Sequence, residues 1–188
     1  EYPTRINSVI IEQPGHVAHL ELNLEYTLIG GNSGIQYRSF KLPKAADAWR
    51  VGGYQADFEA GDRYSGICYG EAFRGILSDR GDKTVLTRED GELKKTVVAN
   101  LGDPAELGKV VKHGQWNDYH ITARGFQFVH RINGQIMTEL VDNDEKDRRA
   151  SGLLALQLHA GPPMTLQVRN IQLKKLPPAV AGKTNRKE

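Results

Sequence analysis

Residues 152–159 place hydrogen-bonding and acid–base side chains at alternate positions of a short apolar segment. Side chains of a β-strand alternate between its two faces. Three leucines, Leu154, Leu156 and Leu158, would therefore face a core, and Ala155, Gln157 and His159 would face away from it. An imidazole can transfer a proton near neutral pH, and an amide can hold a hydroxyl group. This face is typical of the floor of a polar groove, although an exposed strand wetted by solvent has the same pattern.

Other groups able to transfer protons or stabilise charge lie near the ends of further predicted strands. Glu71 follows Tyr69-Gly70, and Asp57 lies on the polar face of a predicted strand at 54–58. Arg38 shares its predicted face with Gln36. Two carboxyl groups, an imidazole and a guanidinium are sufficient for acid–base chemistry if the fold brings them together.

A second set could hold sugar hydroxyls or stack on a sugar ring: Asn32, Ser33, Gln157, Trp116, Asn117 and His120. Each member also has a structural explanation. Asn32 and Ser33 can shape a turn, Asn117 can cap a hairpin, and Trp116 can be a core residue.

Several familiar site patterns are missing from the sequence. It contains no phosphate-binding loop, no Gly-x-Ser-x-Gly, no His-Glu-x-x-His and no paired cysteines. The single Cys68 is predicted to be a buried small hydrophobe. His130 alternates with Phe128 and Ile132, so we expect a hydrogen-bonded core histidine.

The composition bounds the class of protein. The 188 residues carry a net charge of +2, with 39% hydrophobic and 26% charged residues, as in an ordinary globular protein. They predict one domain over residues 1–176 and a disordered basic tail over 177–188. The near-neutral charge argues against a nucleic-acid partner, and no apolar run approaches the roughly 20 residues of a membrane span. One cysteine excludes an internal disulfide.

Short alternating segments separated by turn residues dominate the chain. Strands are predicted at 19–28, 35–40, 54–58, 116–123, 126–132, 136–140, 152–159 and 164–173. Asn133-Gly134 is typical of a type I′ hairpin. Asp103-Pro104-Ala105-Glu106 predicts one short helix, whereas glycines divide the rest of 61–115 into short, less regular pieces. The pattern predicts an all-β protein, an antiparallel β-sandwich or jelly roll with one short helix.

A set of short motifs occurs in a definite order. It consists of 32–38 (Asn-Ser-Gly-Ile-Gln-Tyr-Arg), 69–71 (Tyr-Gly-Glu), 74–77 (Arg-Gly-Ile-Leu), 116–121 (Trp-Asn-Asp-Tyr-His-Ile), 132–134 (Ile-Asn-Gly), 156–159 (Leu-Gln-Leu-His), Asn170-Ile171 and Leu173. In this order the chain resembles the 3-keto-disaccharide hydrolase domain family from about Leu20 to Leu176. The segment 1–15 departs from that family, because it lacks a tryptophan-containing strand with a glycine-rich lead.

The resemblance implies a concanavalin A-like jelly roll in a secreted or periplasmic bacterial protein of carbohydrate catabolism. It implies a glycoside substrate oxidised to a ketone at sugar C3, which acidifies the C2 proton. His159 and Glu71 would be the base and the acid, in either order, and Asp57 a reserve carboxylate. Arg38, or a divalent metal ion held by His159 and Glu71, would stabilise the enolate.

Alternative functions remain open at this point. A glycosidase with two carboxyl groups about 5–9.5 Å apart is possible on such a sandwich, but we find no Glu-x-Asp-x-x-Glu pattern. A non-catalytic carbohydrate-binding or adhesion module would use the same groove. A structural domain that has lost its activity is the third possibility, and a closed groove would favour it.

Overall fold

Two β-sheets face each other in the computed structural model, which describes residues 8–42 and 50–177 and side chains from residue 16 onward. The six-stranded sheet has the order β1 (Ser8–Val17), β12 (Gly152–Leu158), β3 (Asn32–Lys41), β4 (Val51–Glu59), β5 (Cys68–Glu71) and β6 (Gly75–Ser78). All of its neighbouring strands are antiparallel. The tail predicted at 177–188 lies, from residue 178 on, outside the described residues.

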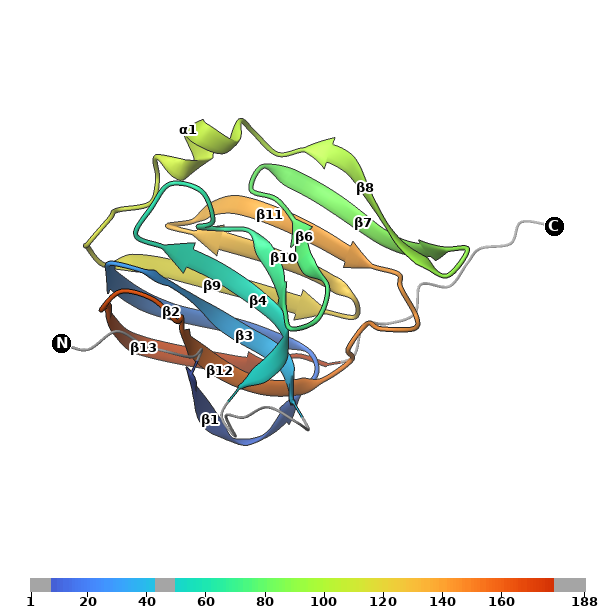
Figure 1. Ribbon diagram of the computed structural model, residues 1–188, viewed down its shortest axis with the longest axis horizontal. Helices are drawn as coiled ribbons and strands as arrows, with labels where there is room; N and C mark the ends of the chain where they lie inside the picture. The colour runs from blue at the N-terminus through green and yellow to red at the C-terminus, as the bar shows by residue number, and fades with distance from the viewer. Residues whose placement is uncertain (1–7, 43–49, 178–188) are drawn as a thin grey trace.

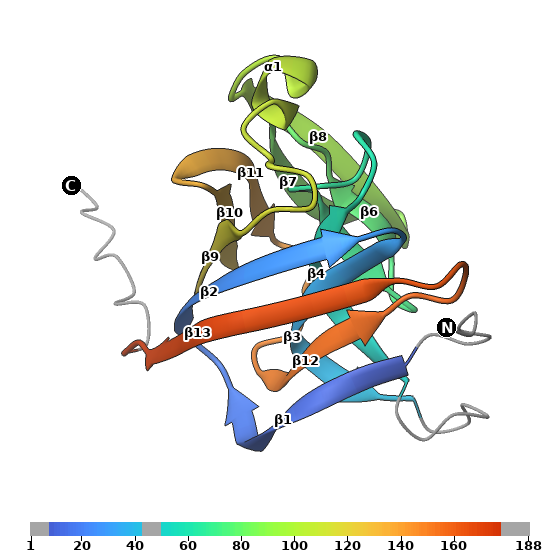
Figure 2. The same cartoon turned by 90° about the vertical axis from the view of Figure 1, so that its left-hand side faces the viewer.

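The seven-stranded sheet covers the other side of the core (Figures 1 and 2). Its order is β13 (Thr165–Lys175), β2 (Leu20–Ile29), β9 (Asn117–Arg124), β10 (Gln127–Ile132), β11 (Gln135–Asp142), β7 (Asp82–Glu89) and β8 (Glu92–Asn100). Its strands are antiparallel except for the parallel pair β11 and β7. The predicted antiparallel β-sandwich is confirmed.

The core lies between the sheets and follows the predicted alternation. In β2, Leu20, Leu22 and Leu24 are buried, and intervening residues are half-buried. In β4 of the opposite sheet, Tyr54 and Phe58 enter the same core cluster. Burying a side chain of this size contributes about 1.5–3 kcal/mol. Since each strand gives one face to this core, the residues between are left on the outer faces of the sandwich.

Two local predictions are confirmed in detail. The helix α1 (Pro104–Gly108) begins after Asp103, whose side chain accepts hydrogen bonds from the backbone N–H groups of Ala105 and Glu106 at 2.9 and 3.0 Å. Asn133 and Gly134 have φ angles of 51° and 80°, both positive as a type I′ turn requires. Among the described residues, no helix is long and apolar enough to cross a bilayer.

The segment 61–115 is more regular than the sequence analysis predicted. It contains β5 and β6 as well as the long hairpin β7–β8 at one edge of the seven-stranded sheet (Figure 1). The turn of this hairpin is Asp90-Gly91, with φ angles of 50° and 85°. Asp-Gly is a hairpin dipeptide in its own right. The sequence does not predict β8, because nearly all of this strand is exposed and its residues show no apolar face.

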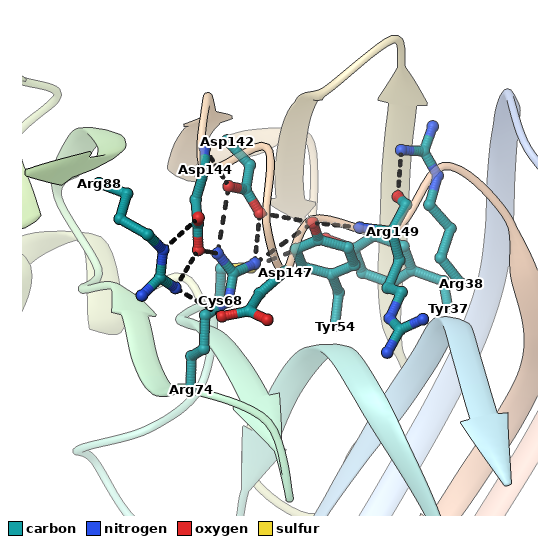
Figure 3. A network of polar contacts seen from close by, with 10 residues as sticks. All are labelled: Tyr37, Arg38, Tyr54, Cys68, Arg74, Arg88, Asp142, Asp144, Asp147 and Arg149. Carbon is teal, nitrogen blue, oxygen red and sulfur yellow. Dashed lines mark hydrogen bonds and ion pairs between the residues drawn. The ribbon is translucent and has the colours of Figure 1, made fainter. Parts of the chain in front are cut away.

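A buried ion network joins the two sheets at one end (Figure 3). Arg74, in the turn between β5 and β6, donates to Asp142 and Asp144, whose side chains are fully buried. Arg88 of β7 donates to both oxygens of Asp144 at 2.8 Å. The hydroxyl of Tyr54 in β4 donates to Asp142. The carboxylates at the end of β11 are thereby tied to the opposite sheet.

Removing Arg74 leaves two buried carboxylates without their shared partner. We expect Arg74→Met to lower the free energy of unfolding by about 3–5 kcal/mol, the usual cost of breaking a buried pair from one side. Urea denaturation measures this change. The matched control is Lys94→Met, because the Lys94–Glu89 pair is more than half exposed and such pairs contribute about 0–1 kcal/mol. Equal effects of the two substitutions would contradict the structural role of the network.

Candidate functional site

A cavity of about 320 Å³ opens on the outer face of the six-stranded sheet, a volume in the range of small-molecule sites. Its lining combines amides, carboxyl groups, one imidazole and an aromatic and aliphatic wall. The lining residues are Asn32, Gln55, Asp57, Glu59, Tyr64, Ile67, Tyr69, Glu71, Ile76, Gln157 and His159. They come from β3, β4, β5, β6, β12 and the adjoining loops, so the sheet itself is the floor of the site.

Strand alternation puts these groups on one face. In β4, Tyr54 and Phe58 enter the core, and Gln55 and Asp57 lie between them on the outer face. Across the sheet, Gln55 pairs with Tyr69 of β5, which in turn pairs with Ile76 of β6. The polar floor and the apolar wall are therefore neighbouring positions of the same ladder.

Gly34 makes room for the central side chain of this floor. A Cβ atom at Gly34 would lie 2.5 Å from Cγ of Gln55, closer than real Cβ atoms approach. The absence of a side chain there lets Gln55 extend over β3 toward β12. The amide of Gln55 consequently reaches Gln157.

Two glutamine amides, those of Gln55 and Gln157, connect the carboxyl groups of Asp57 and Glu71, and a third amide joins them from β3. Gln36 donates to Oε1 of Gln55 at 2.7 Å. Nε2 of Gln55 donates to Oδ1 of Asp57 and, at 3.2 Å, to Oε1 of Gln157. Nε2 of Gln157 donates to Oε2 of Glu71 at 3.3 Å. Because the amides of Gln55 and Gln157 each accept through oxygen and donate through nitrogen, the amide orientations depend on one another.

Asp57 is the carboxyl group most affected by its surroundings. It is 5% exposed, and burial raises the pKa of its carboxyl group to about 8. The hydrogen bond from Gln55 lowers this pKa, whereas the nearby charges of Glu71 and Glu59 raise it. Burial disfavours the charged form of an acid. Asp57 is therefore able to hold a proton near neutral pH and to donate it inside the cavity.

Glu71 and His159 lie at the edge of the amide chain. Glu71 is 7% exposed and receives a hydrogen bond from Arg50 at 3.4 Å as well as that from Gln157. His159 follows the end of β12 and is exposed, with Nδ1 2.6 Å from the carbonyl oxygen of Ala160. The site thus combines a buried acid, a buried ion-paired carboxylate and an accessible imidazole.

The predicted metal ion is not supported by the arrangement of these side chains. Within residues 8–42 and 50–177, no three His, Cys, Asp or Glu side chains gather closely enough to hold a metal ion. Catalytic zinc sites use three protein ligands. His159 and Glu71 share the cavity but do not fit such a ligand set.

The structure separates Arg38 from the groove, which corrects its predicted position. A β-bulge interrupts the pairing of β3 and β4 after Tyr37, and Arg38 takes a φ angle of 49°. The bulge turns Arg38 away from the face of Gln36. Its guanidinium is buried over the ring of Phe128 and donates to the carbonyl oxygen of Ala18. It also donates to the carbonyl oxygen of Arg149 (Figure 3). Arg38 is therefore placed as a structural residue.

Three other candidates lie on the seven-stranded sheet or its connecting loop, away from the cavity. The ring of Trp116 is covered by the guanidinium of Arg169, 3.9 Å from its centroid. Asn117 exchanges hydrogen bonds with the backbone of Lys112 and is thereby used as a cap. His120 alternates with buried residues of β9 and faces outward from that sheet. The prediction that Trp116, Asn117 and His120 lie in the groove is therefore corrected, because none of the three lines the cavity.

Among the remaining candidates, Asn32 lines the cavity. Ser33 is buried and donates to the backbone oxygen of Gln157 at 2.7 Å, so it joins β3 to β12 without lining the cavity. Cys68 and His130 are buried core residues as predicted, and Tyr37 bonds the ring of His130 at 2.9 Å.

Six side chains of the cavity lining were not predicted from the sequence: Gln55, Glu59, Tyr64, Ile67, Tyr69 and Ile76. Gln55 and Tyr69 lie on the outer face of their strands, and the alternation of residues 54–58 was a usable signal for Gln55. Glu59 is the last residue of β4, and Tyr64 lies in the connection between β4 and β5. An isolated aromatic residue in a glycine-bounded polar loop was the available signal for Tyr64, because loops held by a rigid scaffold commonly carry binding residues.

The sequence that forms this cavity matches a known protein family. The family model described as the 3-keto-alpha-glucoside-1,2-lyase-like domain matches residues 4–174. The match extends further toward the N-terminus than the resemblance found in the sequence, and β1 is indeed paired with β12. No protein of curated function matches the chain in sequence.

Solved structures share the fold at low sequence identity. The carbohydrate-binding module CBM66 from Bacillus subtilis is 15% identical, with 91% of this chain and 83% of that chain covered and a TM-score of 0.55. A candidate glycosyl hydrolase from Parabacteroides distasonis is 19% identical, with 90% and 84% covered and a TM-score of 0.54. The concanavalin A-like jelly-roll sandwich is confirmed by these likenesses.

The raised pKa of Asp57 predicts a pH dependence of stability. The folded protein holds this proton more tightly than the unfolded chain, so its contribution is present at low pH. That contribution is lost as the pH rises from about 4 through about 8. We expect the melting temperature of Asp57→Asn, which cannot ionise, to rise relative to that of the wild type as the pH increases from 5 to 9.

Thermal melts across this range measure the difference, which corresponds to about 1.4 kcal/mol per unit of pKa difference. The control is Glu92→Gln, since Glu92 is exposed at the start of β8 and its melting curve should follow the wild type. A constant difference between Asp57→Asn and wild type at all pH values would contradict the buried, proton-holding carboxyl group.

Proposed function

The chain belongs to the 3-keto-alpha-glucoside-1,2-lyase-like domain family, and on that premise we propose that it cleaves 3-keto-glycosides by removing the C2 proton. The ketone at C3 makes this proton acidic. A base on the protein takes it, and its bonding electrons form the enolate. When the enolate collapses, a C1–C2 double bond forms, the C1–O bond breaks, and the leaving oxygen takes up a proton. Addition of water across the double bond would complete a net hydrolysis.

The observation that carries this proposal is the convergence of Asp57, Glu71 and His159 on one cavity. The reaction needs a base near C2 and an acid near the leaving oxygen. Glu71 and His159 supply these roles, in an order that we leave open. Asp57 is a further proton donor, because its pKa of about 8 keeps it largely protonated at neutral pH.

The amides of the cavity would position the sugar. Asn32 lines one side and Gln157 lies on the floor, and both can hydrogen-bond hydroxyl groups. Three carboxyl groups line the cavity, so an uncharged glycoside suits it better than an acidic one. A non-catalytic sugar-binding module is the alternative function. It would use the same amides without a proton transfer.

Substitution of the proposed acid and base separates these alternatives. We expect His159→Ala and Glu71→Gln each to lower kcat for a 3-keto-disaccharide by about 10²–10⁴, the contribution of a positioned proton-transfer group. Circular dichroism should show that both variants keep the fold. The matched control is His120→Ala on the outer face of the other sheet, which should turn over the substrate like the wild type.

Analysis of the products by mass spectrometry and NMR decides what the reaction is. An unsaturated 3-keto sugar identifies a lyase, and its hydrated form identifies net hydrolysis. Full activity of both variants would refute the assigned residues. Binding of the sugar by wild type without any turnover would instead favour the binding module. Repeating the assay with a chelator tests whether a divalent metal ion takes part.

A further inference from the structure

Tyr64 is a large aromatic side chain held at the edge of the cavity in an exposed position. It is 41% exposed, whereas Asp57 and Glu71 on the same cavity are 5% and 7% exposed. This gradient of burial places the carboxyl groups at the floor and Tyr64 at the mouth. Exposed aromatic rings beside a polar cavity are a common feature of binding sites, because they offer a large contact area.

The loop that carries Tyr64 is fixed by its own hydrogen bonds. Oε1 of Glu59 accepts from the backbone N–H groups of Arg63 and Tyr64 at 2.6 and 2.7 Å. The Oγ atom of Ser65 accepts from the backbone N–H of Glu59 at 3.0 Å. A rigid aromatic residue loses little conformational entropy when a ligand packs on it. The backbone position of Tyr64 is therefore built before any substrate arrives.

Hydrogen bonds from Arg80 hold the same loop in place. The guanidinium of Arg80 is buried and donates to the carbonyl oxygens of Asp62 at 2.6 Å and Ser65 at 2.8 Å. The guanidinium of Arg63 lies over the ring of Tyr64, 5.6 Å from its centroid. The loop thus fixes the backbone of Tyr64, and a neighbouring cation packs against its ring.

An apolar wall continues from this ring into the cavity. Tyr69 and Ile76 are paired across β5 and β6, and both line the cavity with Tyr64 and Ile67. The polar groups Gln157, His159 and Asn32 belong to other strands and loops of the lining. A substrate in this cavity would meet hydrogen-bonding groups on one side and an aromatic and aliphatic wall on the other.

We propose that Tyr64 packs against the leaving group and selects glycosides whose leaving group is itself a flat ring, either an aryl group or a second pyranose. The inference rests on the proposed function. The oxidised sugar must reach the carboxyl groups at the floor, and the group on its C1 must depart toward solvent. The group that departs therefore passes the mouth, where Tyr64 lies. Aryl rings and pyranoses share the flat C–H or π surface that stacks on an aromatic ring.

Three substrates of the same anomer test the selection: methyl 3-keto-glucoside, 4-nitrophenyl 3-keto-glucoside and a 3-keto-disaccharide. We expect Tyr64→Ala to lower the preference for one or both ring-bearing substrates over the methyl compound at least tenfold, measured as the ratio of kcat/KM values. The loss should lie mainly in KM. Tyr64→Phe should restore the preference, because the ring makes the contact.

The aryl and disaccharide arms distinguish the two kinds of leaving group. A matched control is Val98→Ala on β8, which truncates a side chain that is 51% exposed and does not line the cavity, and it should leave all ratios unchanged. An equal fall for all three substrates, or no change for any, would overturn the role of Tyr64. In either case turnover of the methyl compound by the wild type leaves the proposed function standing.

Calorimetry decides the inference even if the wild type turns over no substrate. Unoxidised 4-nitrophenyl glucoside and a matching disaccharide are titrated into the wild type and Tyr64→Ala, with thermal melts to show that the variant is folded. A Kd at least tenfold weaker in the variant for either compound supports stacking on Tyr64. Equal affinities, or no binding of either compound by the wild type, would refute it.

Discussion

The charge of Arg74 determines how one end of this sandwich can be built. Asp142 and Asp144 are fully buried, and a buried carboxylate is very costly unless a cation and further donors accompany it. Arg74 serves both carboxylates, and Tyr54 adds a donor from the opposite sheet. Because Arg74 lies in the β5–β6 turn, the same contacts hold the two strands that carry the apolar wall and Glu71. The ion network is therefore the support behind one side of the cavity.

The floor of the cavity depends on a different constraint, the space above Gly34. Any side chain there would collide with Gln55, and Gln55 is the only residue of the chain of amides that contacts both Asp57 and Gln157 among the described hydrogen bonds. Its Nε2 atom has two hydrogens, one for each acceptor. A missing Cβ on one strand thus decides how a carboxyl group on the next strand is connected to the amide of a third. The packing at Gly34 therefore also determines the hydrogen bonding of Asp57.

The sequence predicted the faces of strands better than the grouping of those faces. Alternation correctly placed Asp57 and Gln157 outside the core, and both line the cavity. His120, predicted to belong to the same groove, lies on the other sheet, because periodicity does not say which sheet a strand joins. Arg38 was misplaced because a bulge breaks the alternation locally, which no periodic pattern reveals. Tyr64 lies in a loop whose position depends on hydrogen bonds to Glu59 and Arg80. The alternation of side chains along strands does not predict such contacts.

The energetic cost of burying Asp57 in the cavity floor helps to distinguish a catalytic site from a site that only binds sugar. A module that only holds neutral sugar hydroxyls needs amides and aromatic rings, and Asn32, Gln157 and Tyr64 would be enough for it. Burying Asp57 beside Glu71 adds an energetic penalty, as the raised pKa of Asp57 records. Proteins commonly retain such penalties where a proton must be held ready for transfer. The paired carboxyl groups are therefore easier to explain as parts of a proton-transfer site than as hydrogen-bond acceptors for a passive ligand.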